Sequence, residues 1–371
     1  MRIAQVLPAG AHSWSGVPVV VVQLAVHLAR RGHDVEVWLL QPWTGEEAAL
    51  HGPALRDAGV RVVAAPARGR GRLAALAERD VQIAHLHSVF TPPNALLARR
   101  LQVPYVISPH GGYAPASLRR SGARKALYGH LVERRLVGRA ALLVALTEVE
   151  ARDLVAFGAR GPIVVIPNGV TPPSQQGDPA ALRQELGLHP HHRLLLFVGR
   201  LDVVHKGLDD LVRGLGAALG WHLALVGSDF RGGAEQLRRL SRELGAEARL
   251  VLAGPRHGRA LREAFAAADC FALMSRWEGL PISLLEALSY GLPAIVSPAV
   301  DELVGVVEAG AGWAVRPAEL GALLRDLRHL DGDERARRSS AARALAARYD
   351  WPTVALRYEA AYAEVLDRTT W

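Results

Sequence analysis

The chain has 371 residues, half of them hydrophobic, which is enough for two domains with large buried sheets. A single cysteine, Cys270, excludes an internal disulfide, and no apolar stretch reaches the ~18 residues of a membrane-spanning helix. The net charge is +8, but the basic residues form no basic tail, so we expect no nucleic-acid partner. The start, Met1-Arg-Ile-Ala-Gln-Val-Leu-Pro8, is too soon interrupted for a signal peptide, which favours a cytoplasmic protein.

Short apolar strands alternate with helical segments, a pattern typical of parallel sheets covered by helices on both faces. The first unit of this pattern is a strand at residues 2–7, a loop at 8–16 and a helix at 17–31. Further strands are predicted at residues 35–40, 60–64, 83–87, 105–108, 141–145 and 163–166.

Residues 167–179 are rich in Pro, Gly and polar residues and have no periodicity, so we predict a linker there. The alternation then restarts. Strands are predicted at 194–198, 222–226, 250–253, 270–274 and 294–297, and helices at 208–218, 234–244, 259–267 and 351–366. We therefore predict an α/β fold with domains at 1–167 and 168–350, followed by a C-terminal helical segment at 351–371.

The most informative motif is Glu278-Gly-Leu-Pro-Ile-Ser-Leu-Leu-Glu286. It predicts a tight loop at 278–280 and then a helix with Pro281 at its first position. A helix start offers unpaired backbone N–H groups and a positive dipole end, which suit an anion. Glu278 before this start and Glu286 inside the helix can bind hydroxyl groups on either side of a phosphate. The alternative is a surface helix with one exposed glutamate.

Other candidates lie in loops after predicted strands, because ligands of parallel sheets bind beyond the carboxyl ends of the strands. Gly16 lets the backbone approach a ligand, although the dinucleotide motif G-x-G-x-x-G is absent. His110 precedes Gly111 and Gly112 and is expected to face a cleft. His85 and His87 lack the spacing of a metal site, so no metal is expected.

The loop Gly199-Arg200-Leu-Asp-Val-Val-His-Lys206-Gly207 has the features of a phosphate site. Only two of the 44 basic residues are lysines, so the retention of Lys206 suggests that a compact ammonium is needed there. A guanidinium and an ammonium close together can offset the two charges of a pyrophosphate. Lys125, the other lysine, has no such clear role.

Taken together, these motifs resemble the retaining glycosyltransferases of family 4, which have the two-domain GT-B fold. The resemblance runs nearly end to end. Its motifs are Gly16 before a helix ending Arg-Arg-Gly-His, Pro109-His-Gly, Thr147-Glu-Val-Glu, Ile166-Pro-Asn-Gly, Gly199-Arg-Leu, Lys206-Gly, Val226-Gly-Ser, Gly254, Glu278-Gly-Leu-Pro, Glu286-Ala-Leu and Tyr349-Asp-Trp. It implies two Rossmann-like domains facing each other across a cleft, with the C-terminal helix crossing back onto the first.

The resemblance also implies a nucleotide-sugar donor of UDP or GDP type, held mainly by the second domain. Arg200 and Lys206 would bind the diphosphate and Glu286 the ribose hydroxyls, while His110 would face the sugar near the reacting carbon. The implied sugar contacts are Glu278, Gly279, Leu280, Pro281 and Ile282; Gly254 and Pro255 would lie near the base, and Gly16 near the phosphate or acceptor. His110, Glu278, Arg200 and Lys206 form the implied catalytic set.

This sequence departs from the family pattern in two places. Gly279-Leu280-Pro281 stands where many members have an aromatic residue and a second glycine, which puts the sugar pocket in doubt. Ser15-Gly16 stands where many members carry two glycines.

Fixed cations and helix dipoles can stabilise the leaving diphosphate, so we expect no metal and no cofactor. Retention in the family is attributed to front-face attack guided by the diphosphate. The alternatives are a non-catalytic nucleotide-sugar-binding protein or an epimerase of the same fold.

The acceptor is expected to be a hydroxyl of a glycan, glycolipid or natural-product intermediate, bound by the first domain near Gly111, Gly112, Tyr113 and Arg119. Basic residues continue through Arg120, Arg124, Lys125, Arg134 and Arg135, which suits a phosphorylated or lipid-linked acceptor at an anionic membrane surface. The alternative is a soluble acceptor, with arginines that only solvate a helix. No oligomeric state is predicted.

Overall fold

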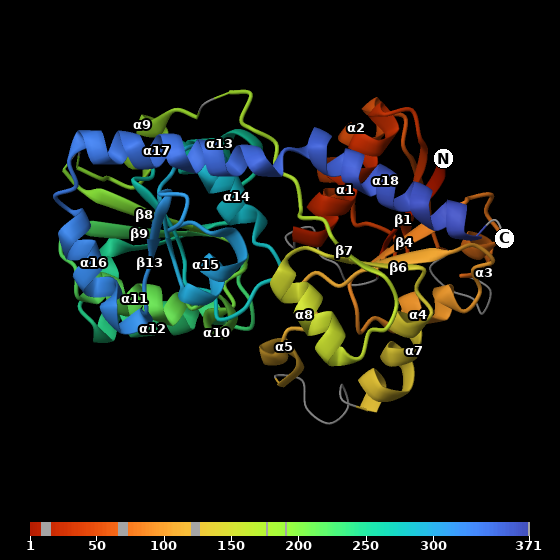
Figure 1. Ribbon diagram of the computed structural model, residues 1–371. Coiled ribbons are helices and arrows are strands. Elements are labelled where there is room, and N and C mark those ends of the chain that lie inside the picture. Colours follow the sequence, from red (N-terminus) through yellow and green to blue (C-terminus); the bar gives the residue numbers. More distant parts are fainter. Residues whose placement is uncertain (9–15, 66–72, 120–126, 176, 190, 370–371) are drawn as a thin grey trace. The chain divides into compact units, whose positions relative to one another are not determined.

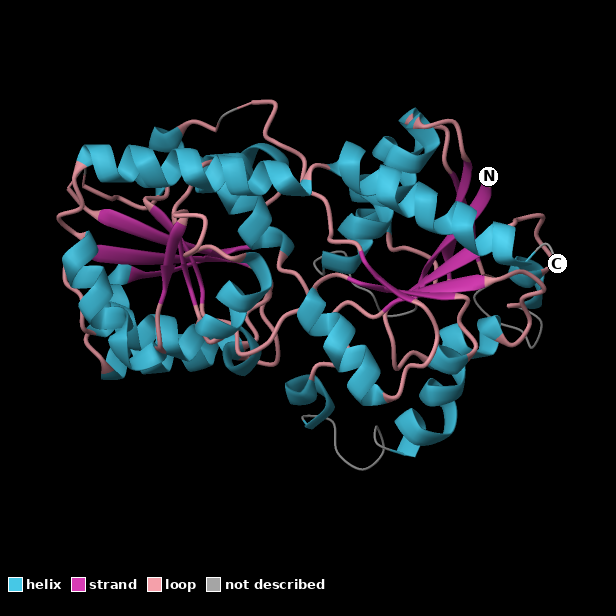
Figure 2. Cartoon of the chain, in the orientation of Figure 1, coloured by secondary structure: helices cyan, strands magenta, loops and turns pink. Residues whose placement is uncertain are grey.

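The computed structural model describes residues 1–8, 16–65, 73–119, 127–175, 177–189 and 191–369. The chain divides into two compact units, the first formed by Met1–Gly169 with Trp351–Trp371 and the second by Val170–Asp350. In each unit, helices cover both faces of one parallel, Rossmann-like sheet (Figures 1 and 2). Within the described part of the chain, no helix combines the length and apolarity needed to cross a membrane.

Seven parallel strands form the sheet of the first unit, in the order β3-β2-β1-β4-β5-β6-β7. The chain moves outward from β1 in one direction and from β4 in the other, so a topological switch point lies between these two strands. The strands are β1 Arg2–Leu7, β2 Asp34–Leu39, β3 Arg61–Ala64, β4 Ile83–His87, β5 Tyr105–Ser108, β6 Leu142–Ala145 and β7 Ile163–Val165. The side chains of β1, β2, β4, β5 and β6 are largely buried, which explains why most of these strands appear as apolar runs in the sequence, whereas those of the edge strand β3 are mostly exposed.

The C-terminal helix belongs to the first unit. It packs along the first helix of the chain, with Trp351 stacked on His27 and an ion pair of 2.5 Å between Arg31 and Glu359 (Figure 1). The helices of this unit are α1 Gly16–Arg30, α2 Gly45–Asp57, α3 Ala74–Ala77, α4 Pro92–Ala98, α5 Pro115–Arg119, a π-helical turn Gly129–Glu133, α7 Arg134–Gly138, α8 Glu148–Phe157 and α18 Trp351–Thr369.

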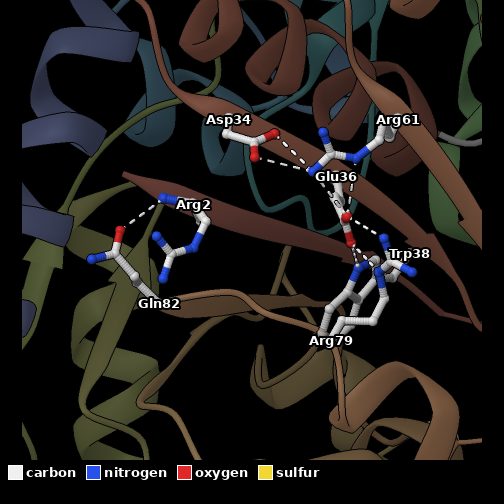
Figure 3. A network of polar contacts seen from close by, with 7 residues as sticks. All are labelled: Arg2, Asp34, Glu36, Trp38, Arg61, Arg79 and Gln82. Atoms are coloured by element: carbon white, nitrogen blue, oxygen red, sulfur yellow. Dashed lines mark hydrogen bonds and ion pairs between the residues drawn. The ribbon is translucent and has the colours of Figure 1, made fainter.

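A polar network stabilises the edge of the first sheet (Figure 3). The buried Glu36 of β2 accepts hydrogen bonds from Trp38 Nε1 at 2.7 Å, Arg79 Nε at 2.5 Å and Arg61 Nε at 3.2 Å. Arg61 also pairs with Asp34 at 2.9 Å. Burial alone would raise the pKa of Glu36, but its hydrogen bonds to Arg79, Trp38 and Arg61 outweigh burial and lower it. The network joins β2, β3 and the end of α3, so its role is structural.

Six parallel strands form the sheet of the second unit, in the order β10-β9-β8-β11-β12-β13. The switch point here lies between β8 and β11. The strands are β8 Arg193–Val198, β9 Trp221–Val226, β10 Leu250–Gly254, β11 Cys270–Leu273, β12 Ala294–Val296 and β13 Gly312–Ala314. The helices are α9 Pro179–Glu185, α10 Val203–Lys206, α11 Leu208–Gly216, α12 Gly233–Glu243, α13 Gly258–Ala267, α14 Ile282–Ser289, α15 Pro298–Val304, α16 Leu320–Leu327 and α17 Gly332–Ala346.

One local prediction differs from the structure: Pro281 is the N-cap residue of α14 and not its first helical residue. The predicted linker at 167–179 contains the division between the two units, which lies between Gly169 and Val170. This segment also has tertiary contacts: Val170 N–H donates to Tyr349 O at 2.7 Å, and a Cβ on Gly177 would lie 2.3 Å from Arg262 O. The sequence also gave no sign of β13, because three residues beginning with glycine are too few to show a pattern.

Candidate functional site

Three glycines lie at the carboxyl ends of adjacent strands in the second unit. Gly199 follows β8, Gly227 follows β9, and Gly254 ends β10. Gly227 donates its N–H to Gly254 O at 2.9 Å, and a Cβ on Gly227 would lie only 1.8 Å from Gly199 O. Apart from Gly254 and its two chain neighbours, no atom of the described residues lies within 4 Å of a Cβ built on Gly254, which has a φ of +66°. These loops thus pack backbone against backbone and leave open space beside Gly254 and the following Pro255.

Arg200 follows the first of these glycines. Its guanidinium lies 5.0 Å from the ring centroid of Phe230, whose ring is also 5.1 Å from Arg231. Among the residues that the structure describes, no carboxylate forms an ion pair with Arg200. The guanidinium of Arg200 thus makes a cation–π contact with Phe230 and remains available to an anion.

Lys206 lies at the end of α10 and forms an ion pair with Glu278. The Lys206 Nζ–Glu278 Oε1 distance is 2.5 Å, and Ser275 Oγ donates to the same oxygen at 2.6 Å. The Lys206 side chain is only 17% exposed, so its ammonium lies mostly out of solvent. Gly207 makes this arrangement possible, because it has a φ of +61° and a Cβ there would lie 2.1 Å from Met274 O.

His205 and Trp277, which the sequence analysis missed, brace this ion pair. Their rings stack at 4.3 Å with an interplanar angle of 10°, and His205 Nε2 donates to Trp277 O at 2.9 Å. Burial, helped by the charge of Lys206, lowers the pKa of His205 to about 4, so the ring is neutral at pH 7. Their positions in the sequence could have indicated them, because His205 directly precedes Lys206 and Trp277 directly precedes Glu278.

Residues 278–286, which lead into α14 and are called the α14 motif below, contain two glutamates whose pKa values are shifted in opposite directions. Burial would raise the pKa of Glu278, but the charge of Lys206 and the hydrogen bonds from Lys206 and Ser275 outweigh burial and hold it below its ordinary value. Burial raises the pKa of Glu286 to about 7, and no side-chain partner of its carboxylate is found in the described part of the chain. Glu286 is thus a desolvated carboxylate that can accept hydrogen bonds from a ligand.

The remaining predicted residues of this motif lie where the loop enters α14. Leu280 and Pro281 are buried, and Ile282 is the first helical residue. Gly279, which directly follows Glu278, is half-buried. The first N–H groups of a helix have no intrahelical acceptor, so this end of α14 suits an anionic ligand.

His110 begins the turn after β5 in the first unit and is half-buried. Its φ of +53° is left-handed, which is uncommon for a residue with a side chain and marks a functional or strained position. The turn is held by Glu150, which accepts hydrogen bonds from the N–H groups of Gly111 and of Leu146, the latter at 2.6 Å. The ring contacts His87, with 3.0 Å between His110 Nε2 and His87 Nδ1.

Two residues predicted on the acceptor side pack beneath this turn. A Cβ on Gly112 would lie 2.2 Å from Val89 Cγ2, so only glycine fits there. Tyr113 is buried and stacks on Phe157 at 4.2 Å.

The other first-unit candidates are exposed. Arg119 ends α5, and Gly16 opens α1. Arg120, Arg124, Lys125 and Ser15 lie outside the described residues. In the described ranges, no group of three or more His, Cys, Asp or Glu residues is suited to hold a metal ion.

Comparison with known proteins gives matches in both units. Residues 15–169 match the family model "Glycosyl transferase 4-like domain", and residues 192–333 match "Glycosyl transferases group 1". The chain is 30% identical to the D-inositol 3-phosphate glycosyltransferase of Xylanimonas cellulosilytica, over 97% of this chain and 94% of that protein. It is 29% identical to the protein of the same name from Nocardia farcinica, over 85% of this chain and 78% of that protein.

Solved structures are similar in fold. Anabaena HepE in complex with UDP-glucose superposes with a TM-score of 0.79 at 20% identity, covering 98% of this chain and 100% of that one. Sucrose-phosphate synthase from Thermosynechococcus elongatus gives a TM-score of 0.78 at 22% identity, with 99% of both chains covered.

Proposed function

The chain belongs to the group 1 glycosyltransferases of the GT-B fold, and we propose that it moves a sugar from a UDP- or GDP-type donor to a hydroxyl acceptor. The observation that carries this proposal is the contrast within the α14 motif. Glu278 is neutralised by Lys206, whereas Glu286 is desolvated and has no partner in the described residues. One carboxylate therefore orients a cation, and the other is left for hydroxyl groups of a ligand.

In this proposal the diphosphate binds Arg200 and Lys206. An ammonium has three N–H donors, and Glu278 uses one of them, so two remain for phosphate oxygens. Glu278 Oε1 already accepts from Lys206 and Ser275, which leaves Oε2 for a hydroxyl of the donor sugar. The N–H groups at the start of α14, beside Gly279, Leu280, Pro281 and Ile282, add a positive dipole end.

Glu286 accepts hydrogen bonds from the two ribose hydroxyls. A ligand that supplies two donors offsets the desolvation of this carboxylate, which no described side chain does. The base lies in the open space beside Gly254 and Pro255.

His110 contacts the sugar near its reacting carbon. Transfer proceeds with retention, as the resemblance to family 4 implies. In the described residues no second carboxylate marks a nucleophile, so we propose that the leaving diphosphate itself guides the acceptor to the same face of the sugar. Arg200, Lys206 and the start of α14 stabilise the charge that develops on the diphosphate, so neither a metal nor another cofactor is required.

The acceptor is a phosphorylated or lipid-linked hydroxyl compound bound by the first unit near Gly16, Gly111, Gly112 and Arg119. Exposed leucines support a peripheral contact with an anionic membrane at the cytoplasmic face: Leu127 is 62% exposed and Leu131 is 49% exposed, close in sequence to Arg134 and Arg135. The relatives named above act, by their names, on an inositol phosphate, which is an acceptor of this chemical class. Tyr113 supports the turn from the core.

The donor is tested with a thermal-shift screen of UDP-, GDP-, ADP- and TDP-sugars on the wild type and on Glu286→Gln. A ligand that binds only the folded state raises Tm, so one donor class should raise the wild-type Tm and lose most of this effect in the variant. If no nucleotide sugar raises Tm, or if the shift is the same in both proteins, the proposed donor site is wrong.

A further inference from the structure

A continuous chain of hydrogen bonds leads from His110 into the core of the first unit. Its successive contacts are His110 Nε2–His87 Nδ1 at 3.0 Å, His87 Nε2–Gln5 Oε1 at 2.8 Å, Gln5 Nε2–Tyr362 Oη at 3.1 Å, Tyr362 Oη–His85 Nδ1 at 2.6 Å and His85 Nε2–Ser108 Oγ at 2.8 Å. This hydrogen-bond chain joins β1, β4, β5 and α18, and all of its side chains except that of His110 are completely buried.

Polar side chains at these positions are unusual. The central strands of a parallel sheet are covered on both faces and are normally apolar. A buried amide, hydroxyl or imidazole without a hydrogen bond destabilises the fold, so each member must be paired by another. Here the sheet and α18 supply Gln5, His85, His87 and Tyr362 to one another, and only His110 extends beyond the buried core.

Gln5 sets the direction of every proton in the chain. Its Oε1 can only accept, so His87 donates from Nε2 and must accept at Nδ1, where the proton comes from His110 Nε2. The amide Nε2 of Gln5 donates to the Tyr362 hydroxyl oxygen, so the single proton of that hydroxyl goes to His85 Nδ1. His85 then donates from Nε2 to Ser108.

We propose that Gln5, His87 and Tyr362 are positioning residues that hold His110 as the Nε2–H tautomer and keep its Nδ1 free to accept a hydrogen bond from a sugar hydroxyl. This inference rests on the proposed function, in which His110 contacts the donor sugar. In the described part of the chain, Nδ1 has no hydrogen-bond partner, and Glu150 fixes the backbone turn that carries the ring.

The charge states agree with this direction. Burial lowers the pKa of His85 and His87 well below the ordinary value, and lowers that of His110 to about 4. The imidazoles therefore stay neutral near pH 7, and only their tautomers can differ. Because Tyr362 comes from α18, the last helix of the chain takes part in the site through His110.

The tautomer can be observed directly by two-bond 1H–15N NMR of protein labelled with 15N-histidine, with His110 assigned by its loss in His110→Gln. We expect the wild-type ring to carry its proton at Nε2. Tyr362→Phe removes the acceptor of Gln5 Nε2, so the amide can rotate and His110 should become a mixture of tautomers. Gln5→Met should have the same effect, and it serves as the second variant if Tyr362→Phe does not fold.

Tyr358→Phe is the matched control, since Tyr358 is also buried on α18. Its hydroxyl lies near Ser108, at the opposite end of the hydrogen-bond chain from His110, and forms none of the contacts that link Gln5, His87 and His110. The control should keep the wild-type tautomer and activity. Tyr362→Phe should lower kcat by about tenfold, equivalent to one lost hydrogen bond, with KM for the donor nearly unchanged.

A wild-type His110 protonated at Nδ1, or a His110 spectrum unchanged in both Tyr362→Phe and Gln5→Met, would overturn the inference. The NMR measurement needs no turnover, so the two proposals can fail separately. The expected tautomers in a protein without transferase activity would contradict only the proposed function. If the wild type transfers sugar normally but the His110 tautomer is unaltered in both Tyr362→Phe and Gln5→Met, only the positioning role is contradicted.

Discussion

Lys206 and Glu278 act as one unit at the scale of single residues. Both side chains are largely buried, so each neutralises a charge that would otherwise be desolvated and unpaired. Their separation of 72 residues hides this dependence in the sequence. Substitutions at either position should therefore lower stability in addition to their effect on function.

Lys206→Ala should weaken diphosphate binding by about 1.5–3 kcal/mol, because a charge-assisted hydrogen bond is lost. It should also lower stability by about 1–3 kcal/mol, since Glu278 stays buried without its cation. UDP or GDP titration and urea unfolding measure the two effects. Lys206→Arg should restore only part of the activity, because a planar fork does not replace a compact ammonium. Near-normal transfer by Lys206→Ala would refute the phosphate assignment.

Glu286 should make nucleotide binding pH-dependent. Its folded-state pKa of about 7 means that the carboxylate is half protonated at neutral pH, whereas hydroxyl donors bind the ionised form. Affinity for UDP or GDP should thus rise between about pH 6 and pH 8, and this rise should vanish in Glu286→Gln. Glu278→Ala should instead spare free nucleotide binding and impair turnover. Equal losses of nucleotide affinity in Glu278→Ala and Glu286→Ala would show that their roles are misassigned.

At the scale of elements, Asp269 connects three segments of the second unit. Its carboxylate pairs with Arg183 at 2.6 Å, Arg193 at 3.0 Å and Arg335 at 2.6 Å, and so joins α9, β8 and α17. It also accepts the Leu194 N–H at 2.8 Å. Burial would raise its pKa, but these partners outweigh burial and lower it. The network fixes the base of the unit, away from the glycine loops at the carboxyl ends of its strands.

Asp269→Asn should destabilise the protein by about 3–5 kcal/mol, the usual effect of removing one partner from a buried ion pair. The contribution of Asp269 should be complete above its unfolded pKa of about 3.9 and should disappear as the pH falls through the lower folded value. Urea unfolding at pH 7 and at pH 3 tests both statements. Asp326→Asn, on α16, is a control, and the stability difference from wild type should be small. A stable Asp269→Asn protein would contradict the role of the network.

A second prediction at the scale of elements concerns the start of α14 and the nearby cations. If they alone stabilise the leaving diphosphate, transfer should be unaffected by excess EDTA. The released nucleoside diphosphate measures this, with and without added magnesium or manganese. Complete loss of activity in EDTA, restored by either ion, would mean that a metal takes part.

At the scale of the whole molecule, the excess of arginine determines how the protein interacts with surfaces. The net charge of +8 favours anionic partners in general, so a specific membrane contact has to be separated from nonspecific attraction. The candidate surface is the basic segment from Arg119 onward, most of which lies outside the described residues.

The protein should bind vesicles that contain anionic lipid but not neutral vesicles, and high salt should abolish binding. Replacing Arg119, Arg120 and Lys125 together by Ala should remove most of this binding in a co-sedimentation assay. The matched control removes three arginines from α12, at Arg238, Arg239 and Arg242, all of them more than half exposed. Equal losses in both triple variants would indicate nonspecific attraction, and absence of binding at low salt would favour a soluble acceptor.

The amino-acid sequence by itself predicted the α/β class and the position of most strands. Buried parallel strands are typically continuous apolar runs, and a strand such as β5 or β6 needs no distant partner to be recognised. The α14 motif and the Lys206 loop were also visible, because glycine, proline and the charged residues stand at fixed local spacings. For the same reason, the sequence showed the candidate residues one motif at a time.

Only the tertiary structure showed which of these residues depend on one another. The Lys206–Glu278 pair, the stack of His205 on Trp277 and the clamp of Glu150 on the His110 turn each join separate loops. Gln5 and Tyr362 lie 357 positions apart, and α18 brings them together beneath His110. Local pattern records the conformation of a segment and which face is buried. It does not record which buried polar groups pair, because that is decided by the packing of the sheet and helices around them.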